Sequence, residues 1–259
     1  MNAIARTLLS AYYAYMLEYR AELFLWALSN VLPFIMMGIW GQAAAGGTLG
    51  FSSLAVARYF LAVFVVRQFN VVWVVWDFER EVVTGTLSQR LVQPIDPVWR
   101  HVAGHVAERL ARLPLVAGMV VVFFLLYPEA WWWPSWPVLV GAIAWLLLAV
   151  ALRFLMQYTV AMLSFWTERA SAIEELSFTA YLYLSGMIAP LEFLPPEWRF
   201  WVELTPFPHM VYTPAILLST GTAPLGRGAI VMGVWFGFFW LLNRWLWRRG
   251  LRHYSGMGA

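Results

Sequence analysis

Long apolar stretches alternate with short polar segments along most of the chain. A bilayer core of about 30 Å needs about 20 apolar residues, because a helix rises about 1.5 Å per residue. Stretches near that length predict six membrane-spanning helices, at 23–43, 54–76, 113–132, 137–163, 173–189 and 229–247. The fifth is the weakest, since Glu174 and Glu175 lie near its start. The pattern is that of an all-α polytopic membrane protein.

Composition supports lipid as the solvent of these helices. Hydrophobic residues make up 62% of the 259 residues and charged residues only 12%, whereas soluble domains have about 45–50% and about 25%. So much apolar side chain does not fit inside one globule of this length. The absence of cysteine excludes disulfides, thiolate metal sites and cysteine nucleophiles.

The basic residues are also informative, because all 17 are arginine and none is lysine. A Walker A phosphate-binding loop needs its lysine, so this chain cannot supply a standard ATPase site. Schiff-base chemistry is excluded for the same reason. An arginine-biased genome would also explain the missing lysines. We expect no catalytic residue and no bound cofactor or metal in this chain, and nothing indicates a nucleic-acid partner.

The arginines predict the orientation, because cytoplasmic segments of membrane proteins are enriched in basic residues. With six spans and the N-terminus inside, the cytoplasmic side holds Arg6, Arg20, Arg80, Arg90, Arg100, Arg109, Arg112, Arg169, Arg244, Arg248, Arg249 and Arg252. The opposite side holds Arg58, Arg199 and Arg227. Both termini are therefore expected in the cytoplasm. The first twenty residues lack the pattern of a cleavable signal, so we expect the first span to act as the insertion signal.

Two segments outside the spans are predicted to lie at the membrane surfaces. Residues 1–22 favour an amphipathic interfacial helix, although they could also be a plain cytoplasmic start to the first span. Its apolar stripe consists of Leu8, Leu9, Tyr12, Tyr13 and Met16. Residues 190–228 form the largest external loop, rich in proline but also in Leu, Phe, Trp and Tyr. Short helices that re-enter the outer leaflet fit this composition better than disorder.

The only sizeable cytoplasmic loop, residues 77–112, carries the strongest local signal. It begins as a charged extension of the second span; Gly85 permits a break, and Pro94 and Pro97 end a short helix. A second amphipathic helix then leads into the third span. Its charged residues are Glu79, Arg80, Glu81, Arg90 and Asp96. Such a braced protrusion suits contact with a separate motor subunit, although a solvated connector is the plainer alternative.

Charged residues within the spans need partners, because burying a charge in lipid costs several kcal/mol. Arg67, near Asn70, lies in the second span, and Arg153 lies in the fourth. Glu174 and Glu175 on the fifth span are candidate partners. These residues either form structural pairs or line a translocation path or a subunit interface.

Histidine spacing offers a weak alternative chemistry. His101 and His105 lie four apart on a predicted helix, with Glu108 one turn further on, which is a spacing that can hold a metal ion. The sequence lacks an HExxH arrangement and an obvious further ligand, so an ordinary polar face of an interfacial helix is the preferred explanation. His209 and His253 are isolated.

The cytoplasmic loop resembles the permease subunits of type-2 ATP-binding-cassette (ABC) exporters, in the six-span branch of about 260 residues. The family pattern G-x-L-x-x-x-L-x-x-P-[IL]-x-P is matched by Gly85, Leu87, Leu91, Pro94, Ile95 and Pro97. Glu18-Tyr19-Arg20 and a first span with Pro33 also fit. The resemblance implies a coupling segment that contacts the ATPase subunit, made of Glu79, Arg80, Glu81, Gly85, Leu87, Arg90, Leu91, Pro94, Asp96 and Pro97.

The same resemblance implies the rest of the assembly. An N-terminal helix would lie along the inner leaflet, and re-entrant helices in 190–228 would gate the exit. Two permease subunits, identical or related, would pair with two ATPase subunits that hold ATP and Mg in a bacterial inner membrane. Aromatic, weakly charged spans favour an amphipathic or lipid-like cargo. The alternatives are an integral-membrane lipid-modifying enzyme and a membrane assembly subunit that transports nothing.

Overall fold

The computed structural model describes residues 3–47 and 51–254, and this part of the chain is helical, without a strand. The α-helices are α1 (Ala3–Glu18), α2 (Arg20–Ser29), α3 (Leu32–Ala45), α4 (Ser53–Phe69), α5 (Val74–Val83), α6 (Thr86–Leu91), α7 (Pro97–Leu126), α8 (Trp136–Ala161), α9 (Ala170–Leu184), α10 (Pro196–Glu203), α11 (Phe207–Met210), α12 (Tyr212–Thr220) and α13 (Leu225–His253). The 3-10 helices are η1 (Pro128–Ala130), η2 (Met162–Phe165) and η3 (Leu191–Phe193).

Within the described residues, five helical stretches are long and apolar enough to cross a membrane, which confirms the all-α polytopic fold. They are Arg20–Ala45, Ser53–Val83, Pro97–Leu126, Trp136–Phe165 and Leu225–His253. The predicted fifth span, 173–189, is wrong in extent. It corresponds to α9, whose 15 residues reach only about 22 Å at about 1.5 Å per residue. The chain turns after it at Gly186, where φ is +85° and a Cβ atom would lie 2.8 Å from Tyr212 Cβ.

The first predicted span, 23–43, is also interrupted. α2 ends at Ser29, and α3 begins two residues after Asn30 with Pro33 in its first turn. Proline fits this position because it has no N–H to donate and its φ suits a helix start. The Asn30 side chain turns back and donates to the Trp26 carbonyl oxygen at 2.8 Å.

The second predicted span, 54–76, breaks where the sequence predicts a continuous helix. α4 ends at Phe69 and α5 begins at Val74, with unwound backbone between them. Side chains of α7 satisfy this backbone: Arg109 donates to the carbonyl oxygens of Phe69 (2.7 Å) and Val71 (2.9 Å), and His105 Nε2 accepts from the Trp73 N–H at 2.9 Å. Non-helical backbone at membrane depth is tolerated only when protein or water satisfies it.

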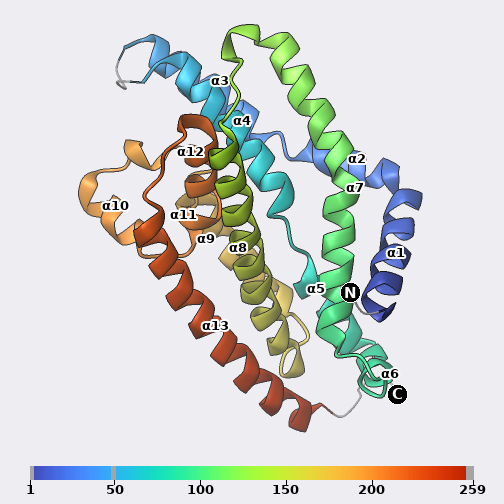
Figure 1. Cartoon of the computed structure of the whole chain (residues 1–259). Helices are drawn as coiled ribbons and strands as arrows, with labels where there is room; N and C mark the ends of the chain where they lie inside the picture. Colours follow the sequence, from blue (N-terminus) through green and yellow to red (C-terminus); the bar gives the residue numbers. More distant parts are fainter. Residues whose placement is uncertain (1–2, 48–50, 255–259) are drawn as a thin grey trace.

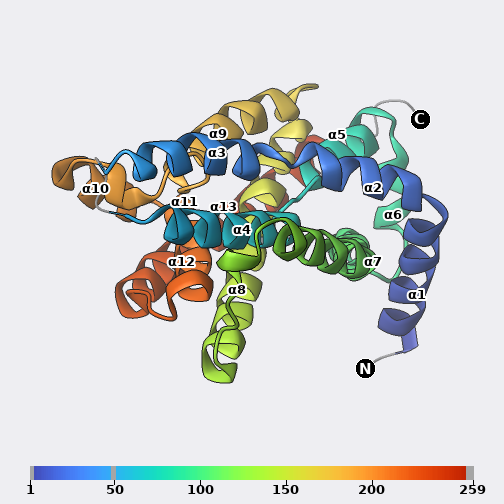
Figure 2. The same cartoon turned by 90° about the horizontal axis from the view of Figure 1, so that it is seen from above.

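The helices surround α4, which is the most deeply buried of them; Phe60, Val63 and Phe64 are fully buried. In Figure 1, α8 lies at the centre, α13 crosses the lower left and α7 the right, with α1 beside the lower half of α7. Figure 2 shows α3 and α4 side by side, and the two helices are in contact. The lower end of the view in Figure 1 contains α6 and the end of α13, so these two basic segments share one side of the molecule.

The segment 190–228 contains the short helices α10, α11 and α12. α12 packs against α4 and α8, and two tryptophans fasten the segment to the bundle. Trp132 Nε1 donates to the Leu218 carbonyl oxygen at 3.0 Å, and Trp145 Nε1 donates to that of His209 at 2.8 Å. The helices agree with the sequence pattern, while their depth in a bilayer stays a prediction.

Candidate functional site

Residues 77–97, which we call the elbow, contain most of the predicted coupling residues. α5 and α6 meet at Gly85, where φ is +76°; this left-handed conformation costs other residues about 1–2 kcal/mol. Ser88 Oγ donates to the Gly85 carbonyl oxygen at 2.6 Å and braces the turn. The Asp96 carboxylate accepts from the Val98 N–H at 3.0 Å and Pro97 is the first residue of α7, so a cap and a proline fix the start of that helix.

One face of the elbow is packed against the bundle. Leu87 is fully buried in the same apolar cluster as Phe78. The buried Glu81 carboxylate pairs with the Arg90 guanidinium, which joins α5 to α6, and His101 Nε2 lies 3.5 Å from the same Glu81 oxygen. Glu81, Leu87 and Arg90 therefore hold the elbow together, and Glu81 and Leu87 have no free surface for a partner.

The opposite face of the elbow is open. Arg80, Leu91, Pro94 and Asp96 are exposed, and Val92, which the sequence analysis did not single out, is 86% exposed. Exposed apolar side chains beside charged ones are common at protein–protein interfaces. We call these five residues the docking face, after the contact with an ATPase subunit that the resemblance implies.

Glu79 has a different position, because it points at the start of α9. Its carboxylate accepts from the Ser171 N–H at 2.7 Å and from Ser171 Oγ at 3.0 Å. The first N–H groups of a helix have no partner within the helix, and negative charge is favourable there. Glu79 thus caps α9 and links it to the elbow. The partner residue lies 92 positions away in sequence, and no local pattern indicates it.

One contact in the structure matches the ion pair that the sequence analysis expects within the membrane. Arg153 Nη2 lies 2.9 Å from Glu174 Oε1, and both side chains are buried. Gln157 Nε2 donates to the same oxygen at 2.6 Å, and the Arg153 guanidinium lies 4.1 Å from the Tyr181 ring centroid. Glu175, the next residue of α9, is exposed and has no ion pair among the described residues.

Arg67 and Asn70 lie beside this pair. Arg67 Nη1 contacts Met187 Sδ at 2.7 Å and, in the described part of the chain, has no carboxylate partner. Asn70 Nδ2 donates to the Met210 carbonyl oxygen at 3.1 Å. A cavity of about 320 Å³ adjoins both groups. Its polar lining includes Arg67, Asn70, Arg153, Gln157, Glu174 and Glu175, and its aromatic lining includes Trp26, Trp73, Trp76, Phe178 and Tyr181.

The elbow and the cavity meet on α9. Glu79 of the elbow holds Ser171 in the first turn of α9, and Glu174 follows three residues later, so it lies on nearly the same face of the helix. A displacement of the elbow would therefore move the carboxylate that pairs with Arg153. This connection is the mechanical feature that the sequence analysis missed.

The predicted histidine cluster braces the break in the second span. His105 uses both ring nitrogens on backbone groups, the Trp73 N–H and the His101 carbonyl oxygen at 2.8 Å. Glu108 pairs with Arg112. Neither His105 nor Glu108 is free to bind a metal ion, and the described residues contain no group of three or more His, Asp or Glu that could hold one.

The two other histidines have structural neighbours. His209 Nε2 contacts the Glu203 carbonyl oxygen at 2.9 Å, and its Nδ1 contacts Thr213 Oγ1 at 3.1 Å. His253 stacks on Trp166 with a 16° interplanar angle.

The sequence matches the model of a known protein family. The model of the ABC-2 family transporter proteins matches residues 42–258, which is most of the chain and includes the elbow, the break in the second span and most of the cavity lining. No curated protein matches the chain. The matched region begins within α3 and so covers four of the five long helical stretches in full. The chain therefore belongs to the ABC-2 family of transporters and is the multi-pass membrane permease of an ABC transporter that works with an ATP-binding subunit.

Proposed function

We propose that this permease exports an amphipathic or lipid-like compound across a bacterial inner membrane, with both termini in the cytoplasm. The ATP-binding subunit docks on the elbow and supplies the ATP and Mg; the chain itself has no lysine for a Walker A loop. The observation that carries the proposal is the contact of Glu79 with Ser171, because it joins the docking face to the intramembrane cavity.

In this mechanism, ATP binding closes the motor and displaces the elbow. α9 follows through Glu79, and the Arg153–Glu174 pair at the cavity is rearranged or shifted with it. The protein then has two states whose populations depend on the nucleotide, and no chemistry on the cargo is needed. Arg67 and Asn70 line the same cavity, so we assign them to the translocation path together with Arg153 and Glu174.

The cavity lining supports the choice of cargo. Its charged groups occupy one part of a wall that otherwise consists of tryptophan, phenylalanine and tyrosine rings. A compound with a polar head and an apolar body matches such a lining better than a small ion, which would need a continuous polar path.

A second permease subunit, identical or related, is part of the proposal. α9 exposes Ile173, Leu176 (73%), Phe178 and Tyr183 (65%), and the charged Glu175 interrupts this surface. A carboxylate facing lipid is unfavourable, so contact with a second permease that supplies a polar partner explains the mixed surface better than lipid alone. Lipid covers the remaining apolar faces.

The docking face gives the most direct test. Val92→Asp and Leu91→Asp place a charge on exposed positions, so the fold is retained, and we expect the ATP-binding subunit to be lost in co-purification. Glu168→Ser, on the exposed connection before α9, is the control and should leave the complex intact. A Val92→Asp, Leu91→Asp variant that still binds the ATP-binding subunit at full affinity would refute the docking face.

Direction and cargo need a separate measurement. Inside-out vesicles that contain the complex should accumulate a fluorescent lipid-like amphiphile when ATP is added outside. ATP-dependent loss of preloaded amphiphile from these vesicles would show import, and transport without the ATP-binding subunit would contradict the whole mechanism.

A further inference from the structure

The end of α13 carries a group of arginines without counter-charges. Arg244, Arg248, Arg249 and Arg252 lie within its last three turns, and the helix contains no Asp or Glu. None of the four forms an ion pair within residues 3–47 and 51–254. With Trp240, Leu241 and Trp245 they line a hollow of about 530 Å³.

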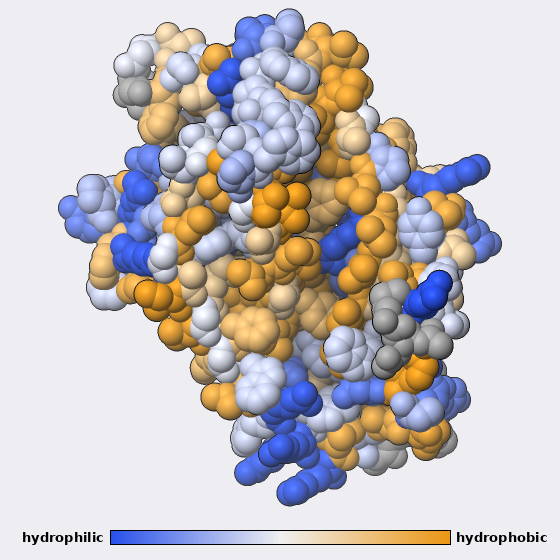
Figure 3. All heavy atoms as spheres, viewed as in Figure 1, coloured by the Kyte–Doolittle hydropathy of each residue, from blue (hydrophilic) through white to orange (hydrophobic). Residues whose placement is uncertain are grey.

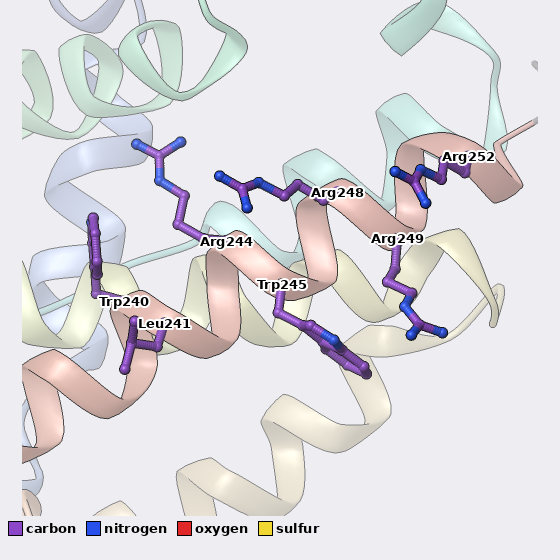
Figure 4. A pocket seen from close by; sticks show the side chains of 7 residues that line it. All are labelled: Trp240, Leu241, Arg244, Trp245, Arg248, Arg249 and Arg252. Carbon is purple, nitrogen blue, oxygen red and sulfur yellow. The ribbon is translucent and has the colours of Figure 1, made fainter.

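Figure 4 shows how these side chains are divided between two sides of α13. Arg244 and Arg248 point to the same side as Trp240, whereas Trp245 and Arg249 point to the other. The Arg249 guanidinium lies 5.3 Å from the Trp245 ring centroid, so it already has a cation–π partner. Arg244, Arg248 and Arg252 have no ion-pair or cation–π partner in the described part of the chain, and Arg244 and Arg248 lie one turn apart on α13.

A second hollow, of about 500 Å³, continues from the first into the membrane region. It lies between α7, α8 and α13, and Trp240 and Arg244 line both hollows. Its floor and walls are mostly apolar, with Ala151 and Phe154 from α8 and Phe236 from α13. Figure 3 shows this hydrophobic depression between α13 and α7, with hydrophilic atoms gathered at the lower end of α13.

Arg109, His105 and Asp96 of the second hollow have partners, whereas Arg244 and Asn243 have none in the described part of the chain. Arg109 donates to three backbone carbonyls, and His105 uses both ring nitrogens. Asp96, the acidic residue there, caps α7. Asn243 is only 9% exposed, and its Nδ2 donor has no partner in the described part of the chain. A buried donor without an acceptor costs about 1–3 kcal/mol, so a ligand oxygen at this position would be favourable.

We propose that one anionic glycerophospholipid occupies the two hollows, with its phosphate at Arg244 and Arg248, an ester oxygen at Asn243 and an acyl chain over Ala151 and Phe154. Basic pockets between membrane helices on the cytoplasmic side bind anionic headgroups. A free phosphate would leave the apolar hollow empty, and a zwitterionic lipid would leave the arginine charges without a counter-charge. The site is separate from the cavity at Arg153, so it does not rest on the proposed transport path.

The test measures lipid affinity of the purified full-length chain by native mass spectrometry, with long-chain phosphatidylglycerol and phosphatidylcholine as probes. We expect tighter binding of phosphatidylglycerol. Arg244→Gln with Arg248→Gln should weaken it roughly 30-fold, since each juxtamembrane arginine contributes about a fivefold factor in affinity. Phosphatidylcholine binding should hardly change. Arg6→Gln with Arg169→Gln removes the same charge from exposed positions elsewhere and should have no effect.

Two further variants distinguish a lipid headgroup from free phosphate as the source of the anion. Ala151→Phe fills the apolar hollow and should weaken the binding of phosphatidylglycerol while leaving any binding of inorganic phosphate unchanged. Asn243→Asp keeps the size of the side chain and should also weaken the binding of the lipid. Equal affinity for the two lipids overturns the proposal, and so does an Ala151→Phe variant that binds phosphatidylglycerol as well as the wild type. Loss of the lipid when the ATP-binding subunit is added would assign this surface to that subunit and would also overturn it.

Discussion

The contact between Glu79 and Ser171 predicts that the elbow and α9 move as one body. Glu79→Ala removes two hydrogen bonds of 2.7 and 3.0 Å that a carboxylate accepts at a helix start. Loss of a helix cap costs about 0.5–2 kcal/mol, and a bond to a charged group lies at the upper part of that range. A loss of about 1–2 kcal/mol changes the equilibrium ratio between the elbow attached to α9 and the elbow detached from it roughly 5- to 30-fold.

The absence of cysteine in the wild-type sequence makes a direct distance measurement possible. Spin labels at Val83→Cys and Thr179→Cys lie on the elbow and on α9, at exposed positions outside the docking face. We expect one narrow distance that stays the same in nucleotide-free and ATP-trapped complexes. With Glu79→Ala added, the distribution should broaden and shift when ATP is trapped.

The control for this measurement is Glu168→Ala, which removes a carboxylate from the exposed connection before the same helix. It should leave the narrow distance unchanged. A wild-type distance that changes with nucleotide, or a Glu79→Ala variant that behaves like the wild type in both states, would refute the rigid connection.

Three further predictions concern buried charges and pH. Glu81→Arg should lower the thermal unfolding midpoint sharply, because it leaves two like charges in contact, and adding Arg90→Glu should restore much of the loss. Arg153→Gln leaves Glu174 buried without its cation, so we expect about 3–5 kcal/mol of destabilisation by chemical unfolding in mixed micelles. Burial lowers the pKa of His209, while an unfolded histidine binds a proton near pH 6.5; stability should therefore fall as pH drops below about 6.5.

Matched variants separate these effects from general damage. Glu175→Gln, on the exposed face of α9, should change stability by less than about 0.5 kcal/mol. Trp166→Leu removes a ring from the exposed His253 contact and should leave the acid dependence of unfolding unchanged, whereas His209→Asn should weaken it. An acid dependence of undiminished size in His209→Asn would contradict the assignment.

The parts of the fold that follow from local sequence were predicted well. Apolar stretches locate the long helices, because the lipid requirement acts on each stretch separately. Gly85 and Pro97 mark the limits of α6 and the start of α7, since their backbone restrictions are local. The contact of Arg153 with Glu174 also follows from the sequence, because few carboxylates lie at membrane depth.

The features that depend on distant residues could not be predicted. Residues 70–73 contain neither glycine nor proline, and the helix breaks there because Arg109 and His105 hold the unwound backbone. α9 is shorter than its apolar stretch, since Gly186 packs against Tyr212 and turns the chain. Both features depend on tertiary packing, which the local pattern of hydrophobic residues does not indicate.

The break in the second span has a consequence for biosynthesis. The side chains that satisfy its backbone are translated 32 to 40 positions later, and until then those peptide groups would face hydrocarbon at a cost of several kcal/mol each. We therefore expect α4, α5 and α7 to leave the insertion machinery together, as one hairpin. A nascent chain that is stalled before α7 has left the ribosome should hold a second hydrophobic segment that is not yet stably inserted in the bilayer.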